Sequence, residues 1–291
     1  MKIGVAGLGR MGHAMAARLL EVRGEVTVWN RSAVRAGDLL AEGAVWAESP
    51  AALAEGCDVV VSILADDAAA REVYLGAAGL LAATPRRAMV VEMSTLSPEM
   101  VRRLAAEAAA RGVGFVESPV LGTVMPARTG QLAALTAGAA EEIARAGPVF
   151  EALTRTVIHV GEIGQAAVLK LCVNDMVIGY LALLGEATAL GEAAGLSRDL
   201  VLSAIAECPA AAPLLKIKGD VLRGAGVPKV AASIATILKD MELLAGEAEA
   251  RGLRLPLALG TRDSLRAARD SGWEERDMAE LVAFHRGQAG G

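Results

Sequence analysis

Residues 2–12 read KIGVAGLGRMG, and this stretch decides the fold of the first half of the chain. The apolar run Lys2–Ala6 predicts a strand, and the pattern over Met11–Glu21 predicts a helix. A G-x-G-x-x-G motif follows the strand and extends into the start of the helix; it consists of Gly7, Leu8, Gly9, Arg10, Met11 and Gly12. Because the motif directly follows a strand and opens a helix, it predicts a dinucleotide-binding turn.

Each glycine of this motif has a physical task. Gly7 permits the tight turn, Gly9 lets the backbone approach a pyrophosphate, and Gly12 lets the helix pack closely on the strand. The pyrophosphate would lie at the positive end of the helix, where free N–H groups point outward. The alternative is an ordinary glycine-rich turn between a strand and a helix.

The end of the second predicted strand, Glu25–Trp29, indicates which dinucleotide binds. NAD sites usually carry Asp or Glu there, whereas this chain has Asn30, Arg31 and Ser32. A carboxylate would repel the 2′-phosphate of NADP, while Arg31 can pair with it and Ser32 can donate to it. These residues favour NADP(H) over NAD(H). The alternative is that Arg31 is a solvated turn residue.

Short apolar runs alternate with helical patterns throughout the first half of the chain. The predicted strands are Lys2–Ala6, Glu25–Trp29, Asp58–Leu64, Ala88–Met93, Gly114–Glu117, Leu132–Thr136 and Thr156–Val160. The predicted helices between them include Met11–Glu21, Ala33–Ala41, Pro98–Ala110 and Glu141–Leu153. Such alternation predicts a parallel sheet covered by helices on both faces, extended in mixed orientation near residues 114–160. Leu64, at the end of its strand, is expected among the cofactor-binding residues.

After Gly161 the strand patterns stop. One long helix is predicted from Gln165 to about Ala194, followed by helices at Arg198–Glu207, Ala232–Arg251, Pro256–Asp270 and Glu274–Phe284. The sequence therefore predicts an α/β Rossmann-like domain over residues 1–161. An all-α substrate and dimerisation domain would cover residues 162–291, with the long helix joining the two.

Composition excludes some classes of function. The net charge is -5 and no basic stripe occurs, which argues against a nucleic-acid partner. The apolar run Ala166–Gly185 approaches the length of a membrane span but contains Lys170, Asn174 and Asp175, so we expect a buried helix and no membrane partner.

The cysteines and histidines indicate the expected compartment and whether a metal site is expected. Cys57, Cys172 and Cys208 form no C-x-x-C pair, and no secretion signal is visible, so a reducing cytoplasm is expected. The three histidines lack metal-ligand spacing, so no metal site is expected.

Lys170 is the most informative lysine, because nearly all its neighbours are apolar. Asn174 lies four residues later, on the same helical face. Desolvation would favour the neutral amine, which suits proton transfer to an oxygen that gains charge as a hydride arrives. Asn174 could hold the substrate or position Lys170. The alternative is a lysine that extends to solvent, with Asn174 bonded to another helix.

The chain resembles the β-hydroxyacid dehydrogenase family over nearly its whole length. The motifs that carry the likeness are the glycine turn, Glu92-Met93-Ser94-Thr95, Ser118-Pro119-Val120-Leu121-Gly122-Thr123, Gly130-Gln131-Leu132, the pair Lys170/Asn174, and Lys239-Asp240. Within the family it looks most similar to glyoxylate and succinic semialdehyde reductases. That closer likeness is carried by Glu92–Thr95, Pro126-Ala127 and the segment 212–219.

The resemblance implies roles for the residues of the site. Lys170 would be the general acid in reduction, and Asn174 would hold the substrate. Thr95 would lie at the nicotinamide ribose and near the substrate. Gly122 and Thr123 would offer backbone N–H groups to the substrate carboxylate.

Two residues of the second half also match the family pattern. Lys239 would reach the cofactor, and Asp240 would border the active site. Thr95 and Lys239 have plainer alternatives, as a helix cap and a surface lysine.

Two positions depart from the family's pocket. Leu121 stands where the family usually has Ser, so a substrate-binding hydroxyl is missing unless Thr123 supplies one. Ala232 stands where the semialdehyde reductases usually carry Phe, about eight residues before Asp240. Loss of a buried polar contact can redirect specificity, so the exact substrate stays open.

The expected activity is reduction of a short aldehyde or keto acid by NADPH. An imine reductase on the same fold, or a non-catalytic NADP-binding sensor, are the alternatives; Lys170 argues against the first and Leu121 leaves both open. The apolar helical half and the family resemblance both imply a homodimer or homotetramer.

Overall fold

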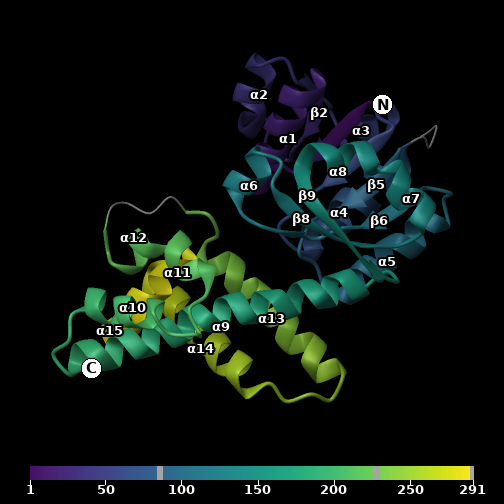
Figure 1. The fold of residues 1–291 in the computed structure, drawn as a ribbon. Coiled ribbons are helices and arrows are strands. Elements are labelled where there is room, and N and C mark those ends of the chain that lie inside the picture. The colour runs from purple at the N-terminus through teal and green to yellow at the C-terminus, as the bar shows by residue number, and fades with distance from the viewer. Residues whose placement is uncertain (84–87, 226–229, 289–291) are drawn as a thin grey trace. The chain divides into compact units, whose positions relative to one another are not determined.

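The computed structural model describes residues 1–83, 88–225 and 230–288, and Figure 1 shows its helices and strands. The chain divides into two compact units, Met1–Lys170 and Leu171–Gly291. The division falls inside one continuous helix, α9 (Gln165–Ala193), which the sequence predicts almost to the residue. The domain boundary expected after residue 161 stays a prediction.

In the described part of the first unit, nine strands form one sheet in the order β3-β2-β1-β4-β5-β6-β8-β7, with β9 beside β8. The strands are β1 (Ile3–Ala6), β2 (Thr27–Trp29), β3 (Val45–Trp46), β4 (Val59–Ser62), β5 (Met89–Glu92), β6 (Phe115–Glu117), β7 (Val120–Leu121), β8 (Leu132–Ala137) and β9 (Thr154–Gly161). The first six strands in this order, β3-β2-β1-β4-β5-β6, are parallel and have the arrangement of a Rossmann fold. β8 then runs antiparallel to β6 and β7. The predicted parallel sheet with a mixed extension is confirmed.

Helices cover both faces of this sheet. They are α1 (Arg10–Arg23), α2 (Gly37–Ala41), α3 (Pro50–Gly56), α4 (Asp67–Leu75), α5 (Pro98–Ala109), α6 (Val124–Arg128), α7 (Ala140–Arg145) and α8 (Gly147–Leu153). Successive residues of a strand face opposite sides, so Val61 joins the core under α1, α6 and α8, and Val60 joins the core under α3, α4 and α5. Valine runs buried on both faces explain why these strands show no polar alternation.

The second unit is helical. Besides the later part of α9 it contains α10 (Arg198–Ala206), α11 (Pro213–Ile217), α12 (Gly219–Leu222), α13 (Ile234–Ala250), α14 (Pro256–Ala268) and α15 (Leu281–Gln288). Ser197 and Ser233 cap α10 and α13 through their side chains. One apolar core joins these helices, with Leu181, Leu238 and Leu265 among its most buried members. The predicted all-α second half is confirmed.

Three predicted helices are wrong in extent. The helix expected over 33–41 is α-helical only in α2 and starts as a 3₁₀ helix at Ala33–Ala36. The helix expected over 141–153 is broken into α7 and α8, because Pro148 lacks the N–H that a helix interior needs and begins a new helix instead. The helix expected from Glu274 has its α-helical part only from Leu281. Asp277 starts a short 3₁₀ turn there, and its side chain forms a capping box with Glu280.

Candidate functional site

Two glycines of the turn between β1 and α1 are required by the fold itself. Gly7 has a φ of 97°, which L side chains rarely adopt. A Cβ on Gly7 would lie 2.3 Å from the carbonyl oxygen of Ile63, and one on Gly12 would lie 1.9 Å from that of Gly7. The turn therefore packs directly against the end of β4.

Gly9 has a different environment. A Cβ there would meet nothing within 4 Å, and its φ of -67° suits any residue. Gly9 is the N-cap of α1 and has no side chain to cap the helix, and the first turn holds no acidic residue. The N–H groups of a helix's first turn point toward an anion bound at its start, so this turn fits the pyrophosphate of a dinucleotide.

Asn30 ties this turn to the loop after β2. Its Oδ1 accepts a hydrogen bond from the backbone N of Leu8 at 2.9 Å, and its Nδ2 donates to the carbonyl oxygen of Ser32 at 3.0 Å. Arg31 and Ser32 themselves are exposed. The loop thus presents a guanidinium and a hydroxyl to solvent beside the glycine turn, at the place where an NAD site would carry a carboxylate.

The loops after β4 and β5 meet at the same edge of the sheet. The backbone N of Leu64 donates to Ser94 Oγ at 2.7 Å, and both Leu64 and Thr95 are half-buried. The structure therefore joins Leu64 to Ser94, the residue before Thr95, at the carboxyl ends of neighbouring parallel strands, where ligands of such sheets bind.

A buried carboxyl group lies beneath these loops. Glu92 Oε1 accepts from the backbone N of Ser94 at 2.7 Å. Glu92 Oε2 lies 2.6 Å from Ser62 Oγ and 2.8 Å from the hydroxyl of Tyr74. Burial raises the pKa of Glu92 above its usual range.

The segment after β7 forms a second corner of the first unit. Leu121 is half-buried and packs against a small apolar cluster that includes Leu135 and Ala166. Gly122 has a φ of 128°, and Thr123 is the N-cap of α6 without a side-chain bond to it. Leu121 therefore has a packing role in place of the hydroxyl that the family pattern predicts.

The start of α9 is held by a second buried acid. Glu117 Oε2 accepts from the backbone N of Gly164, and Oε1 accepts from that of Ala167, each at 2.5 Å. Lys170 lies three residues after Ala167 and is half-buried. A carboxylate on the first N–H groups of a helix also opposes the helix dipole favourably.

The second unit brings three other predicted residues together. Asn174 Nδ2 on α9 donates to Asp240 Oδ2 on α13 at 2.7 Å. The other oxygen of Asp240 lies 2.9 Å from Lys239 Nζ. Asp240 is buried, and its carboxyl group has an ion-pair partner in Lys239 and a hydrogen-bond donor in Asn174. Ala232 packs against the core of this unit.

Sequence reasoning missed Ser62, Tyr74 and Glu117 as parts of the site. An available signal was an acid as the last residue of a buried strand, which is costly without partners. That signal points to Glu92 and Glu117, but neither the tyrosine nor the serine could be inferred from spacing.

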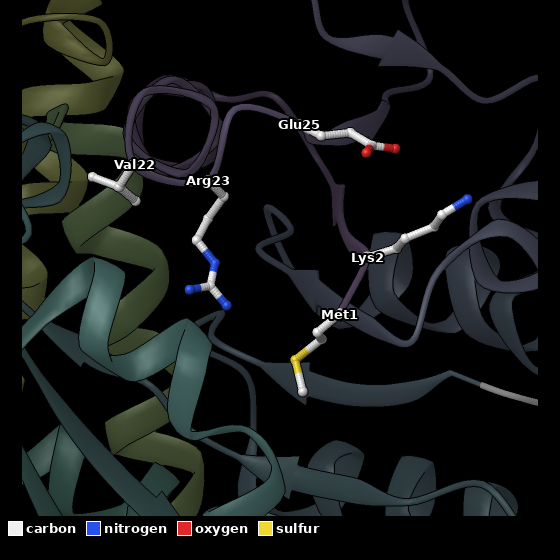
Figure 2. Close-up of a pocket in the computed structure, with 5 residues that line it drawn as sticks. All are labelled: Met1, Lys2, Val22, Arg23 and Glu25. Carbon is white, nitrogen blue, oxygen red and sulfur yellow. The ribbon is translucent and has the colours of Figure 1, made fainter.

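Two hollows lie away from these residues. One, of about 310 Å³, is lined by Met1, Lys2, Val22, Arg23 and Glu25 (Figure 2). It lies at the amino end of β1, opposite the glycine turn, so it is not the dinucleotide site. The other, of about 640 Å³, lies between α13 and α14. Among the described residues, no group of three His, Cys, Asp or Glu could hold a metal ion.

A Rossmann sheet with an open glycine turn defines a class of dinucleotide-binding proteins. Residues 2–161 match the family described as the NAD binding domain of 6-phosphogluconate dehydrogenase. Residues 164–285 match the one described as NAD-binding of NADP-dependent 3-hydroxyisobutyrate dehydrogenase. The chain belongs to the β-hydroxyacid dehydrogenase family and is an NAD(P)-dependent oxidoreductase acting on CH–OH groups.

Individual relatives align over almost the whole chain. A 3-hydroxyisobutyrate dehydrogenase of Pseudomonas aeruginosa is 33% identical over 98% of this chain and 99% of its own. Glyoxylate/succinic semialdehyde reductase 1 of Arabidopsis thaliana is 30% identical, with 97% of each chain covered. The structure of Psf3 in complex with NADP+ and 2-OPP is similar with a TM-score of 0.86 and 31% identity, covering 97% of this chain and 99% of that one. The expected family, fold and use of a nicotinamide cofactor are confirmed.

Proposed function

We propose that this enzyme reduces a short aldehyde or keto acid, such as glyoxylate or succinic semialdehyde, with NADPH, and that Lys170 is its general acid. The observation that carries the proposal is the anchoring of α9: Glu117 binds the N–H of Ala167, one turn before a half-buried lysine. A lysine fixed in this way can present its ammonium group at a constant position. The Arabidopsis relative supplies the class of substrate by its name.

The proposed chemistry assigns one task to each residue. The bound cofactor supplies the hydride. The ammonium of Lys170 donates a proton to the carbonyl oxygen as that oxygen gains charge, and the neutral amine accepts it in the reverse direction. The amide of Asn174 would hold the substrate, and the backbone N–H groups of Gly122 and Thr123 would bind its carboxylate. Thr95 and Lys239 would contact the cofactor.

The preference for NADP(H) is also proposed. It is supported by the exposed guanidinium of Arg31 and hydroxyl of Ser32, which follow Asn30 in a loop hydrogen-bonded to the glycine turn. A guanidinium can bind the 2′-phosphate in a forked geometry, and no acidic side chain occupies these three positions to repel it.

We further propose that the chain forms a homo-oligomer through α9. Met176, Leu183 and Leu190 are 74%, 57% and 75% exposed and recur every seven residues, so they lie on one face of the helix. By length and composition α9 could also cross a membrane, with a third of its most apolar window buried. A second copy covering this face accounts for the same exposed residues. Light scattering after size-exclusion chromatography tests it, with Leu183→Glu expected to give the smaller species.

The experiment that tests the activity is a panel of aldehydes, keto acids and hydroxy acids with NADPH and NADH, followed by the absorbance of reduced nicotinamide. We expect turnover with NADPH on a short carboxylate-bearing aldehyde. Lys170→Ala should reduce kcat by roughly 10²–10⁴-fold, the range of general acid catalysis, with NADPH affinity retained.

Other results would redirect the proposal. Turnover that needs a ketone together with an amine would indicate the imine reductase alternative. NADPH binding without turnover on any member of the panel would contradict the proposed reaction.

A further inference from the structure

Two buried acids stand side by side in the sheet of the first unit. Glu92 on β5 and Glu117 on β6 are partners in the parallel register, and each is 1% exposed. Glu92 lies two residues after Val90, and Glu117 lies two residues after Phe115. Alternate residues of a strand face the same side, and Val90 and Phe115 belong to the same core, so the two acidic side chains share one face of the sheet. Two like charges at neighbouring buried positions cannot both ionise at low cost. The partners of each carboxyl group decide which one keeps its proton.

Glu117 is surrounded by donors. Its two oxygens accept from the backbone N–H groups of Gly164 and Ala167, one each. A neutral acid would need an acceptor for its own hydrogen, and both of these partners are donors. Burial raises the pKa of Glu117 above its usual range, and the two backbone N–H groups and the guanidinium of Arg102, from α5, act against that rise. The hydrogen bonds to both oxygens and the nearby cation favour an ionised Glu117.

Glu92 is in the opposite situation. Its Oε2, Ser62 Oγ and the Tyr74 hydroxyl form a triangle of oxygens with sides of 2.6, 2.8 and 2.5 Å. Three such contacts need three hydrogens, since two oxygens at this distance repel one another without one between them. Serine and tyrosine supply one hydrogen each. The third can come only from the carboxyl group of Glu92.

The titratable groups around the triangle are consistent with three hydrogens shared among its three oxygens. Tyr74 faces it from α4, and burial raises the pKa of its hydroxyl well above the usual range, so the tyrosine keeps its hydrogen. Glu117 faces it from β6. Burial raises the pKa of Glu92, and this effect outweighs the hydrogen bonds from Ser62, Ser94 and Tyr74, which lower it.

We infer that Glu92 is a neutral carboxylic acid and Glu117 a carboxylate, and that this division of one proton holds the reacting parts of the site in place. Neutral Glu92 binds the N–H of Ser94, whose hydroxyl in turn accepts from Leu64. It thus joins the two loops at the carboxyl ends of β4 and β5. Ionised Glu117 fixes the first turn of α9, ahead of Lys170. Both are positioning residues, and the roles of the groups that they position rest on the proposed function.

Infrared spectroscopy of the full-length protein without cofactor tests the protonation directly. We expect a carbonyl-stretch band of a protonated carboxyl group at pH 8 in the wild type. Difference spectra should show this band lost in Glu92→Gln and kept in Glu117→Gln, two variants that differ from the wild type by the same isosteric change. Loss of the band in Glu117→Gln instead, or its absence from the wild type, would overturn the inference. This readout needs no substrate, so it stands even if the proposed reaction is wrong.

Binding and kinetics test the positioning. An amide can donate and accept as a neutral acid does, whereas a leucine side chain can do neither, so Glu92→Leu should lower kcat by roughly tenfold or more and Glu92→Gln should lose less than Glu92→Leu. In Glu117→Gln one amide nitrogen faces an N–H group, so kcat should fall by roughly tenfold or more while NADPH affinity changes by less than about threefold. Glu117→Asp, which retains the charge, should recover part of the loss. Equal losses in both Gln variants, or none in Glu117→Gln, would contradict the assigned roles.

Discussion

The side-chain amide of Asn174 donates to Asp240 Oδ2 at 2.7 Å and so joins α9 to α13 by a bond between two polar groups. Asp240 is buried, and its second oxygen pairs with Lys239 at 2.9 Å. Because the nitrogen of the amide is committed to Asp240, the direction of its oxygen is fixed as well. Asp240 thereby sets the orientation of the group proposed to hold the substrate.

Replacing Asp240 by Ala should therefore impair substrate binding. We expect KM to rise by roughly tenfold, the value of one hydrogen bond to a charged group, with the thermal midpoint changed little. Asp240→Asn retains an acceptor for Asn174 and should lose less. Lys239→Met removes the ion pair together with the proposed cofactor contact, so its effect should fall on NADPH affinity more than on the KM of the substrate. Wild-type KM in Asp240→Ala would show that Asn174 does not depend on this bond.

Cofactor choice should depend on Arg31. Arg31→Ala should weaken NADPH binding by about 10–100-fold, because a hydrogen-bonded charge pair contributes about 1.5–3 kcal/mol, and should leave NADH binding unchanged. Arg31→Asp should invert the preference. Titration of each cofactor by fluorescence measures both constants. Equal losses for the two cofactors would mean that Arg31 does not recognise the 2′-phosphate.

Gly9 and Gly12 separate cofactor binding from folding. An added Cβ on Gly9 meets nothing in the protein, so Gly9→Ala should keep its thermal midpoint and lose dinucleotide affinity by about tenfold or more. Gly12→Ala would place a Cβ 1.9 Å from the Gly7 carbonyl oxygen and should lower the midpoint itself. Tight dinucleotide binding by Gly9→Ala would place the pyrophosphate away from this turn.

Leu121 offers a test of substrate choice. Leu121→Ser restores the hydroxyl of the family pattern and should raise activity on small carboxylate-bearing aldehydes. It should also cost about 1–2 kcal/mol of stability, because a half-buried leucine leaves its cluster. Leu121→Ala loses the same packing without gaining a hydroxyl, so the two variants isolate its effect. Equal activities in both would mean that the pocket binds a different group.

The buried ion pair of the second unit should matter for stability. Both oxygens of Asp277 lie 2.9 Å from Lys218 Nζ, and Asp277 is fully buried. Lys218→Met leaves that charge without its partner and should lower the free energy of unfolding by about 3–5 kcal/mol. The exposed pair Arg269–Asp270 is the control, and Arg269→Ala should change stability by less than about 1 kcal/mol. Urea denaturation measures both, and similar small effects would contradict the prediction.

The sequence predicted those helices, strands and turns that depend on interactions between residues close together in the chain. The glycine turn and α9 follow from short-range spacing and a long apolar run, and both are where the sequence places them. Strands β3 and β7 were missed, because two residues show no periodicity. The predicted helices at 141–153 and 274–284 were too long, because Pro148 and Asp277 begin new turns within them.

The residues of the site likewise include some that the sequence predicts and some that it does not. Thr95, Lys170 and Asn174 stand in recognisable motifs. The bond from Glu117 to Ala167 spans fifty residues, and that from Tyr74 to Glu92 depends on how α4 packs on the sheet. Such contacts are set by tertiary packing, which a single sequence does not reveal.

One consequence follows from α9 passing through both compact units without a break. Lys170 is the last residue of the first unit and Asn174 belongs to the second, yet they are four residues apart on one rod and separated by about 6 Å along its axis. As long as α9 stays helical between positions 170 and 174, the backbones of Lys170 and Asn174 keep the same separation, whatever motion the two units make. The spacing between the proposed proton donor and the amide is therefore set by the rise of the helix, and only a break or an inserted residue between positions 170 and 174 would alter it.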